Sequence, residues 1–182
     1  MRVYLDNQLV TYILSGIQNK LSTDPVVEQE INSMVALSQM SNIELLISEE
    51  VLAEIRKLPD ISAKRKDLEQ MYQKLKQRRG VIRNSTVNYN DPIATYNSPD
   101  VFYGHPFTDK DLDEVRRFLK SKGNQSDFDA RYIANAMLLE NKIDVFLTAD
   151  KKTIWNHRVD IMAKFGVMVK LPSELATELL RS

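Results

Sequence analysis

The chain contains no cysteine and only two histidines, His105 and His157, among its 182 residues. The lack of thiols excludes disulfide cross-links and thiolate metal sites. Two imidazoles also argue against a histidine-rich zinc site. A metal would therefore have to be held mainly by oxygen atoms, which favours Mg²⁺, Mn²⁺ or Ca²⁺ over zinc or copper.

A long hydrophobic run is also missing, and so is an excess of charge of either sign. No apolar stretch reaches the length needed to span a membrane. The N-terminal segment MRVYLDNQLV meets Asp6 before a signal-peptide core could form. We therefore expect a cytoplasmic protein without a membrane partner. The 25 basic and 25 acidic residues cancel, so the total charge does not predict a nucleic-acid partner.

The distribution of charge along the chain is more informative than its total. From Arg56 to Arg83 ten lysines and arginines stand against three acids, and from Asn84 to Glu114 six acids stand against one lysine. A basic segment of this kind can contact phosphates, and it is equally consistent with a solvated helix face. The candidate RNA contacts in the basic segment are Lys74, Lys76, Arg78 and Arg79.

The remaining composition is that of an ordinary globular protein, with 43% hydrophobic and 27% charged residues. The length predicts a single domain over residues 1–182, with an enlarged middle segment at about 60–106. Short apolar runs alternate with helical patterns, which predicts an α/β fold with a mostly parallel central sheet and helices on both faces. The predicted strands span residues 3–5, 43–47, 81–87, 143–148 and 167–169. The predicted helices span about 7–20, 25–40, 48–58, 62–79, 108–122, 127–140, 151–164 and 173–180.

Four acidic residues follow these elements in a pattern that predicts a site. Asp6 and Asp150 each come after an apolar strand, Glu54 lies in the helix after the second strand, and Asp129 lies in the first turn of a helix. Ligands of parallel sheets bind outside the carboxyl ends of the strands, so we expect all four side chains at that edge. Clustered carboxylates need a compensating cation, and two divalent ions can activate water and steady the leaving oxygen at a phosphodiester.

Each of these acids also has a structural interpretation. Asp6, Asp129 and Asp150 could cap the helices that they precede or begin. Glu54 is harder to explain in this way, because it borders the apolar helical stripe that includes Val51. A carboxylate at the margin of the core should be neutralised, paired or bound to a metal.

Three segments, VYLDNQLV, LLISEEVLAEI and DFDARYIANAMLLENKIDVFLTADKKTI, resemble the PIN-domain nuclease family, whose members include toxins of toxin–antitoxin pairs. The resemblance covers nearly the whole chain and implies a PIN-like fold. It also implies that Asp6, Glu54, Asp129 and Asp150 bind Mg²⁺ or Mn²⁺ and support cleavage of single-stranded RNA. A protein antitoxin and a second copy of the chain are the candidate protein partners.

Three further residues are candidates for additional roles at this site. Asn7 stands where the family often has a small hydroxyl residue, and its amide could still bind a ligand or water. Asp127 lies two residues before Asp129 and is an additional or alternative ligand. Thr148 could orient a metal-bound water through its hydroxyl, or bond locally at the end of its strand.

Two other classes of function compete with the nuclease. The chain could be a non-catalytic PIN-like module that binds RNA or protein without cutting. It could also be a receiver-like domain with a phosphoacceptor aspartate, but receivers show paired acids after the first strand, and here Asp6 is followed by Asn7.

Overall fold

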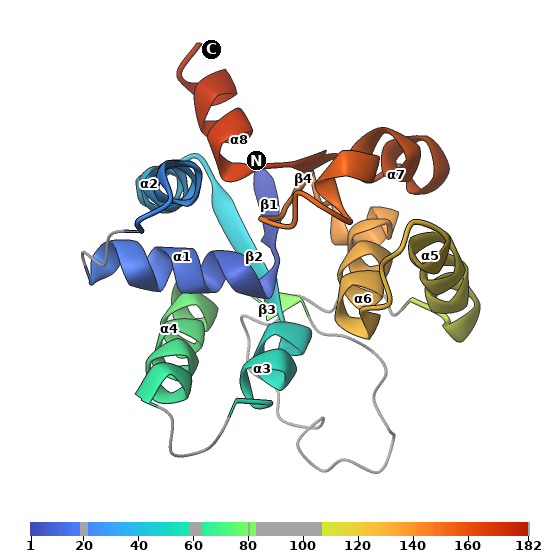
Figure 1. Ribbon diagram of the computed structural model, residues 1–182, viewed down its shortest axis with the longest axis horizontal. Coiled ribbons are helices and arrows are strands. Elements are labelled where there is room, and N and C mark those ends of the chain that lie inside the picture. Colours follow the sequence, from blue (N-terminus) through green and yellow to red (C-terminus); the bar gives the residue numbers. More distant parts are fainter. Residues whose placement is uncertain (19–21, 59–62, 80, 83–106, 182) are drawn as a thin grey trace.

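The computed structural model describes residues 1–182 except 19–21, 59–62, 80, 83–106 and 182 (Figure 1). Its five strands are β1 Arg2–Leu5, β2 Glu44–Ser48, β3 Val81–Ile82, β4 Val145–Leu147 and β5 Val169–Lys170. The longer helices are α1 Asn7–Ile17, α2 Pro25–Gln39, α3 Glu49–Ile55, α4 Ala63–Arg79, α5 Asp109–Ser121, α6 Asp127–Ala136, α7 Arg158–Phe165 and α8 Pro172–Leu179. Two short 3₁₀ helices are also present: η2 Leu139–Asn141 precedes β4, and η3 Trp155–His157 directly precedes α7.

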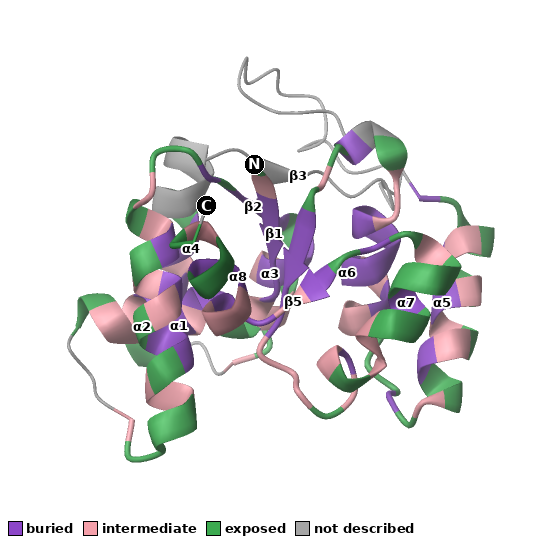
Figure 2. Cartoon of the chain, turned by 90° about the horizontal axis from the view of Figure 1, so that it is seen from above, coloured by how far each residue is buried: buried purple, intermediate pink, exposed green. Residues whose placement is uncertain are grey.

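The strands form one parallel sheet in the order β3-β2-β1-β4-β5. Helices α1, α2, α4 and α8 lie on one side of it, and α5, α6 and α7 lie on the other (Figures 1 and 2). This arrangement confirms the predicted α/β fold class, a parallel sheet with helices on both faces. Among the described residues, no helix is long and apolar enough to cross a membrane.

Strand β1 lies at the centre of the sheet (Figure 2), and its residues Val3, Tyr4 and Leu5 are fully buried. The ring of Tyr4 packs at 5.6 Å from that of Phe146 in β4, measured between centroids. The hydroxyl of Tyr4 donates to Ser48 Oγ at 2.8 Å. Ser48 directly precedes α3, and its side chain makes no capping hydrogen bond to that helix. The buried strands thereby hold their carboxyl ends at one edge, where the candidate site lies.

Most element boundaries agree with the sequence prediction, and Thr108 and Asp111 form a capping box at the start of α5. The strand predicted at 81–87 is seen as β3, Val81–Ile82, and its remaining positions lie outside the described residues. The predicted enlarged middle segment at about 60–106 also lies mostly outside them.

Two predicted helices were too long. The one predicted at 127–140 ends at Ala136, because Asn141 Nδ2 donates to the carbonyl of Asn135 and Lys142 turns with a φ of 48°. The one predicted at 151–164 begins only at Arg158. Its first residues fold into a turn instead, because Asp150 Oδ1 accepts from the backbone N–H groups of Lys152 and Thr153, both at 2.8 Å. A side chain that accepts from two successive N–H groups favours a turn over a continuous helix.

Candidate active site

The four predicted acids line one pocket of about 590 Å³ at the carboxyl edge of the sheet. Asp6 follows β1, Asp150 lies in the loop after β4, Glu54 comes from α3 and Asp129 from the first turn of α6. All four lie at the edge that the sequence analysis predicted. The tertiary structure therefore brings together carboxylates that are up to 144 positions apart in the sequence.

Asp6 is the most buried of the four, with 6% of its surface exposed. Its Oδ1 accepts from the N–H of Leu9 at 3.0 Å, so it caps α1 as the structural interpretation predicted. Its Oδ2 accepts from Thr148 Oγ1 at 2.6 Å and from the N–H of Ala149 at 3.1 Å. Burial, assisted by the charge of Asp129, raises the pKa of Asp6 to about 6 despite these bonds. Capping and membership of the site are thus compatible at this residue.

Asp129 and Asp150 both line the pocket, one from α6 and the other from the loop after β4. Burial raises the pKa of Asp129, and the negative charges of Asp150 and Glu54 raise it further. Asp150 Oδ2 accepts a short hydrogen bond from Thr153 Oγ1. Asp129 Oδ2 accepts from Asn124 Nδ2 at 2.8 Å. The two carboxylates are close enough to repel each other and are each restrained by a neutral donor.

Glu54 is half-buried at the margin of the core, as its position in the helical pattern predicted. Its Oε2 accepts from the hydroxyl of Tyr132 at 2.7 Å. Tyr132 is buried in α6, and its pKa is raised well above its ordinary value, first by burial and then by the charge of Glu54. The tyrosine therefore stays protonated and serves as a fixed donor to this carboxylate.

The donor atoms around the pocket suit a hard divalent cation. They are carboxylate oxygens together with Asn7 Oδ1, which is buried and has no hydrogen-bond partner. An orphaned buried acceptor beside several acids is the arrangement that a cation would satisfy. Among the described residues, however, no three acids or histidines are gathered into a metal-ligand group. The four carboxylates thus share one pocket without forming such a group, and each of them accepts at least one hydrogen bond from the protein.

Two of the additional candidates take other positions. Asp127 is exposed and points to two arginines, with Arg116 Nε at 2.6 Å and Arg131 Nε at 2.8 Å. Burial raises its pKa, but the hydrogen bonds from Arg131 and Arg116 outweigh this effect and leave the pKa lowered. Asp127 does not line the pocket. Thr148 is fully buried, and its hydroxyl donates to Asp6 rather than into the pocket.

The candidate RNA contacts in the basic helix cannot be placed at the site. The backbone of α4 is described as far as Arg79, but the side chains of Lys74, Lys76, Arg78 and Arg79 lie outside the described residues. Lys151 and Lys152 do line the pocket. They follow Asp150 directly and provide the positive charge at its rim.

Sequence reasoning did not identify Glu30, a buried acid of α2 that lines the same pocket. Its carboxylate accepts from Ser173 N at 3.0 Å and Ser173 Oγ at 2.9 Å, and it pairs with Lys151 Nζ at 3.1 Å. These bonds tie α2 to the start of α8. The signal was present, because Glu30 lies three positions after Val27 and four before Met34, on the inward stripe of its helix.

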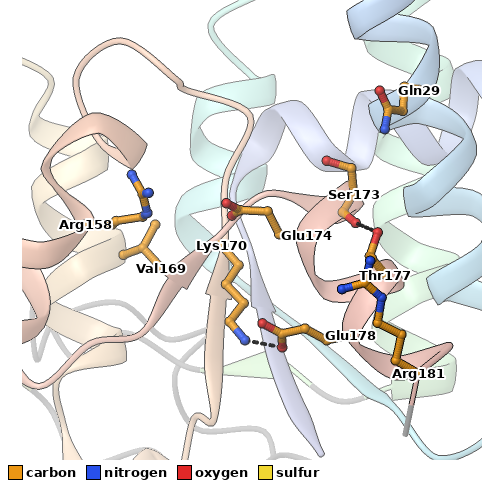
Figure 3. A pocket seen from close by; sticks show the side chains of 9 residues that line it. All are labelled: Gln29, Arg158, Val169, Lys170, Ser173, Glu174, Thr177, Glu178 and Arg181. Carbon is orange, nitrogen blue, oxygen red and sulfur yellow. Dashed lines mark hydrogen bonds and ion pairs between the residues drawn. The ribbon is translucent and has the colours of Figure 1, made fainter.

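A second hollow of about 520 Å³ lies between α2, α7, β5 and α8 (Figure 3). Its acids are already engaged: Glu178 pairs with Lys170, and Glu174 accepts from Trp155 Nε1 at 2.8 Å and from Leu171 N at 2.9 Å. The acidic pocket at the carboxyl edge is therefore the better candidate for metal-dependent chemistry.

Comparison with known proteins supports the fold. No protein-family model matches the chain, and no curated protein sequence matches it. Among solved structures, the chain is similar to a crystal structure of VapBC2 from Rickettsia felis bound to a DNA fragment from its promoter. The match has a TM-score of 0.51 and 15% sequence identity, and it covers 93% of this chain and 98% of the other. At this identity the similarity shows a shared fold.

Proposed function

We propose that the chain is a metal-dependent endoribonuclease that cuts single-stranded RNA. The observation that carries the proposal is the meeting of Asp6, Glu54, Asp129 and Asp150, from four separate segments, in one pocket at the carboxyl edge of the sheet. Burial raises the pKa of Asp129, and the nearby negative charges of Asp150 and Glu54 raise it further. A structural role for each acid alone would not require them to share a pocket.

The chain's own residues would divide the work of the reaction. Asp6, Glu54, Asp129 and Asp150 would hold Mg²⁺ or Mn²⁺, which supplies activation of water and neutralisation of developing charge. Asn7 would contribute its orphaned Oδ1 to the cation or to a bound water. Thr148 fixes the orientation of the Asp6 carboxylate. Lys151 and Lys152 would contact phosphates at the rim, where Lys151 is already held by Glu30.

The similarity to a VapBC structure supports a toxin role within the proposed function. The expected partner would then be a separate antitoxin protein, and a small neighbouring gene for a DNA-binding antitoxin would support this assignment. A homodimer remains a prediction.

One observation favours a second candidate, a non-catalytic PIN-like module that binds RNA or protein. Among the described residues no three acids form a metal-ligand group, and all four acids of the site accept hydrogen bonds from the protein itself. Such a pocket could remain without metal and present a fixed polar surface.

A cleavage assay separates the two candidates. Purified protein is incubated with single-stranded and with folded RNA in Mn²⁺, in Mg²⁺ and in chelator. The nuclease predicts cleavage of the single strand that requires the cation and is absent in chelator. RNA that binds with equal affinity under all three conditions and stays intact would support the non-catalytic module.

Lys152 provides a separate test of how RNA is bound. The side chain is exposed on the pocket rim. Replacing it with alanine is expected to weaken binding of single-stranded RNA and to reduce the slope of log affinity against log salt concentration by about 0.7, the value for one phosphate contact. Binding is measured over a salt series in chelator, so that no RNA is cut.

The matched control is Lys142→Ala, an exposed lysine just before β4, at the opposite edge of the sheet. This variant should keep the affinity and the salt slope of the wild type. If both lysine variants change the slope equally, Lys152 contributes only to the general charge of the protein and not to a contact at the pocket.

A further inference from the structure

Asn124 is a buried polar residue that lies behind Asp129 and does not itself line the pocket. It lies in the turn between α5 and α6, directly after Gly123, whose φ of 82° lies in the left-handed region that favours glycine. Only 6% of Asn124 is exposed. Its backbone N–H donates to the carbonyl of Leu119 at 2.9 Å, which closes the end of α5 and fixes where the side chain starts.

The amide of Asn124 links Asp129 to Asp150 through Thr153. Its Nδ2 donates to Asp129 Oδ2 at 2.8 Å and to Thr153 Oγ1 at 2.8 Å. The Thr153 hydroxyl in turn donates to Asp150 Oδ2. Together these bonds form a continuous chain from Asp129 through Asn124 and Thr153 to Asp150.

The orientation of this amide is determined by its surroundings. Asn124 Oδ1 accepts from the N–H of Ser126 at 2.7 Å, so the oxygen must face the start of α6. Both hydrogens of the NH₂ group are then directed at Asp129 and Thr153. An ionised carboxylate only accepts hydrogen bonds, so the opposite rotamer would set the amide oxygen against Asp129 and lose both contacts.

A neutral donor is well suited to this position. Asp129 and Asp150 repel each other, and a lysine or arginine between them would hold them together by supplying a positive charge. That charge would compete with a metal cation. An asparagine and a threonine restrain both carboxylates and leave the negative charge of the pocket intact.

We propose that Asn124 and Thr153 are positioning residues that hold Asp129 and Asp150 together for a divalent cation. The inference rests on the proposed function, because the cation is what the paired carboxylates would bind. Neither residue is assigned to the substrate or the reacting atoms. Outer hydrogen-bond partners of metal ligands typically change metal affinity or activity by about 10- to 100-fold when they are removed.

The test measures Mn²⁺ affinity by calorimetry, with thermal melting recorded on the same samples and no RNA present. Asn124→Ala and Thr153→Val are each expected to weaken Mn²⁺ binding by at least roughly 10-fold. Thr153→Val keeps the shape of the side chain and removes the hydroxyl. Thr153→Ser restores the hydroxyl and is expected to bind Mn²⁺ as the wild type does.

The double variant tests whether the two side chains act through one link. If they do, combining Asn124→Ala with Thr153→Val weakens binding little more than the more damaging single change. Fully additive effects would overturn the proposal. So would unchanged Mn²⁺ affinity in variants with a lowered melting temperature, because that result assigns both residues to folding alone.

Asn141→Ala is the matched control. Asn141 is also a buried asparagine with a backbone partner, but it lies before β4 at the other edge of the sheet. This variant should lose stability and keep its Mn²⁺ affinity. If the wild type itself binds no Mn²⁺, the proposed function fails and this inference falls with it. If the wild type binds Mn²⁺ and the variants bind it equally well, only this inference fails.

Discussion

Asp129→Asn is expected to lower Mn²⁺-dependent RNA cleavage by on the order of 100-fold or more while the protein stays folded. The substitution keeps the size of the side chain and removes one negative charge from the pocket. Cation affinity should fall, and with it the activation of water and the stabilisation of developing charge. The remaining amide oxygen can still accept from Asn124 Nδ2, so the local packing is preserved.

Cleavage and melting, measured on the same variant, together distinguish the two interpretations of Asp129. Its pKa is raised in the folded protein, first by burial and then by neighbouring carboxylates, so the charge destabilises the native state at neutral pH. In chelator, Asp129→Asn should therefore melt at the same temperature as the wild type or at a higher one. If Asp129 served only to begin α6, the substitution would leave both the cleavage rate and the melting temperature unchanged, because asparagine is also favourable at the N-terminus of a helix.

Asp127→Asn is the matched control on the same helix. Asp127 is exposed and paired with Arg116 and Arg131 outside the pocket. Its substitution should leave cleavage unchanged. Full activity of Asp129→Asn, together with loss of activity in Asp127→Asn, would show that Asp127 belongs to the site and Asp129 does not.

The metal-free protein is expected to lose stability as pH rises from about 4 to about 7. The pKa of Asp6 is about 6 in the folded protein against an ordinary value of 3.8, mainly because the residue is buried. A carboxyl group with a raised pKa binds its proton more tightly in the native state. The contribution of Asp6 to the free energy of unfolding is fully present below its pKa in the unfolded chain. It is lost as pH rises through its pKa in the folded protein, and the free energy of unfolding then decreases by up to about 3 kcal/mol. The raised pKa of Asp129 acts in the same direction.

Chemical unfolding in chelator, measured at intervals from pH 4.5 to 8, checks this expectation. Asp111, Asp127 and Asp160 have lowered pKa values, so their contributions are lost only as pH falls below about 4, outside this window. Adding Mn²⁺ at pH 7.5 should recover stability, because a cation that binds only the native state stabilises it by mass action. A free energy of unfolding that stays level or rises across the window in chelator would contradict the expectation.

Local pattern was sufficient to predict most of the secondary structure and the edge at which the acids lie. Asp6 and Asp150 follow apolar strands, and parallel strands end at a common edge, so their proximity followed from the alternation of strands and helices. The position of Glu54 at the border of the core followed from the 3.6-residue period of α3. The hydrophobic period of a helix and the order of strands and helices along the chain can both be read from a single sequence.

Only the tertiary structure decided which donors from distant segments hold these acids. The bond from Tyr132 to Glu54 spans 78 positions, and the bond from Thr148 to Asp6 spans 142. Asn124 and Thr153 meet across 29 positions between two turns, and nothing in either local segment marks them as partners. The tertiary structure also decided the direction of the Asp127 side chain. Asp127 lies two residues before Asp129 in the sequence, but its carboxylate accepts from Arg116 and Arg131 outside the pocket. Successive residues of a helix differ in direction by about 100°, so closeness in sequence does not decide which side chain enters a pocket.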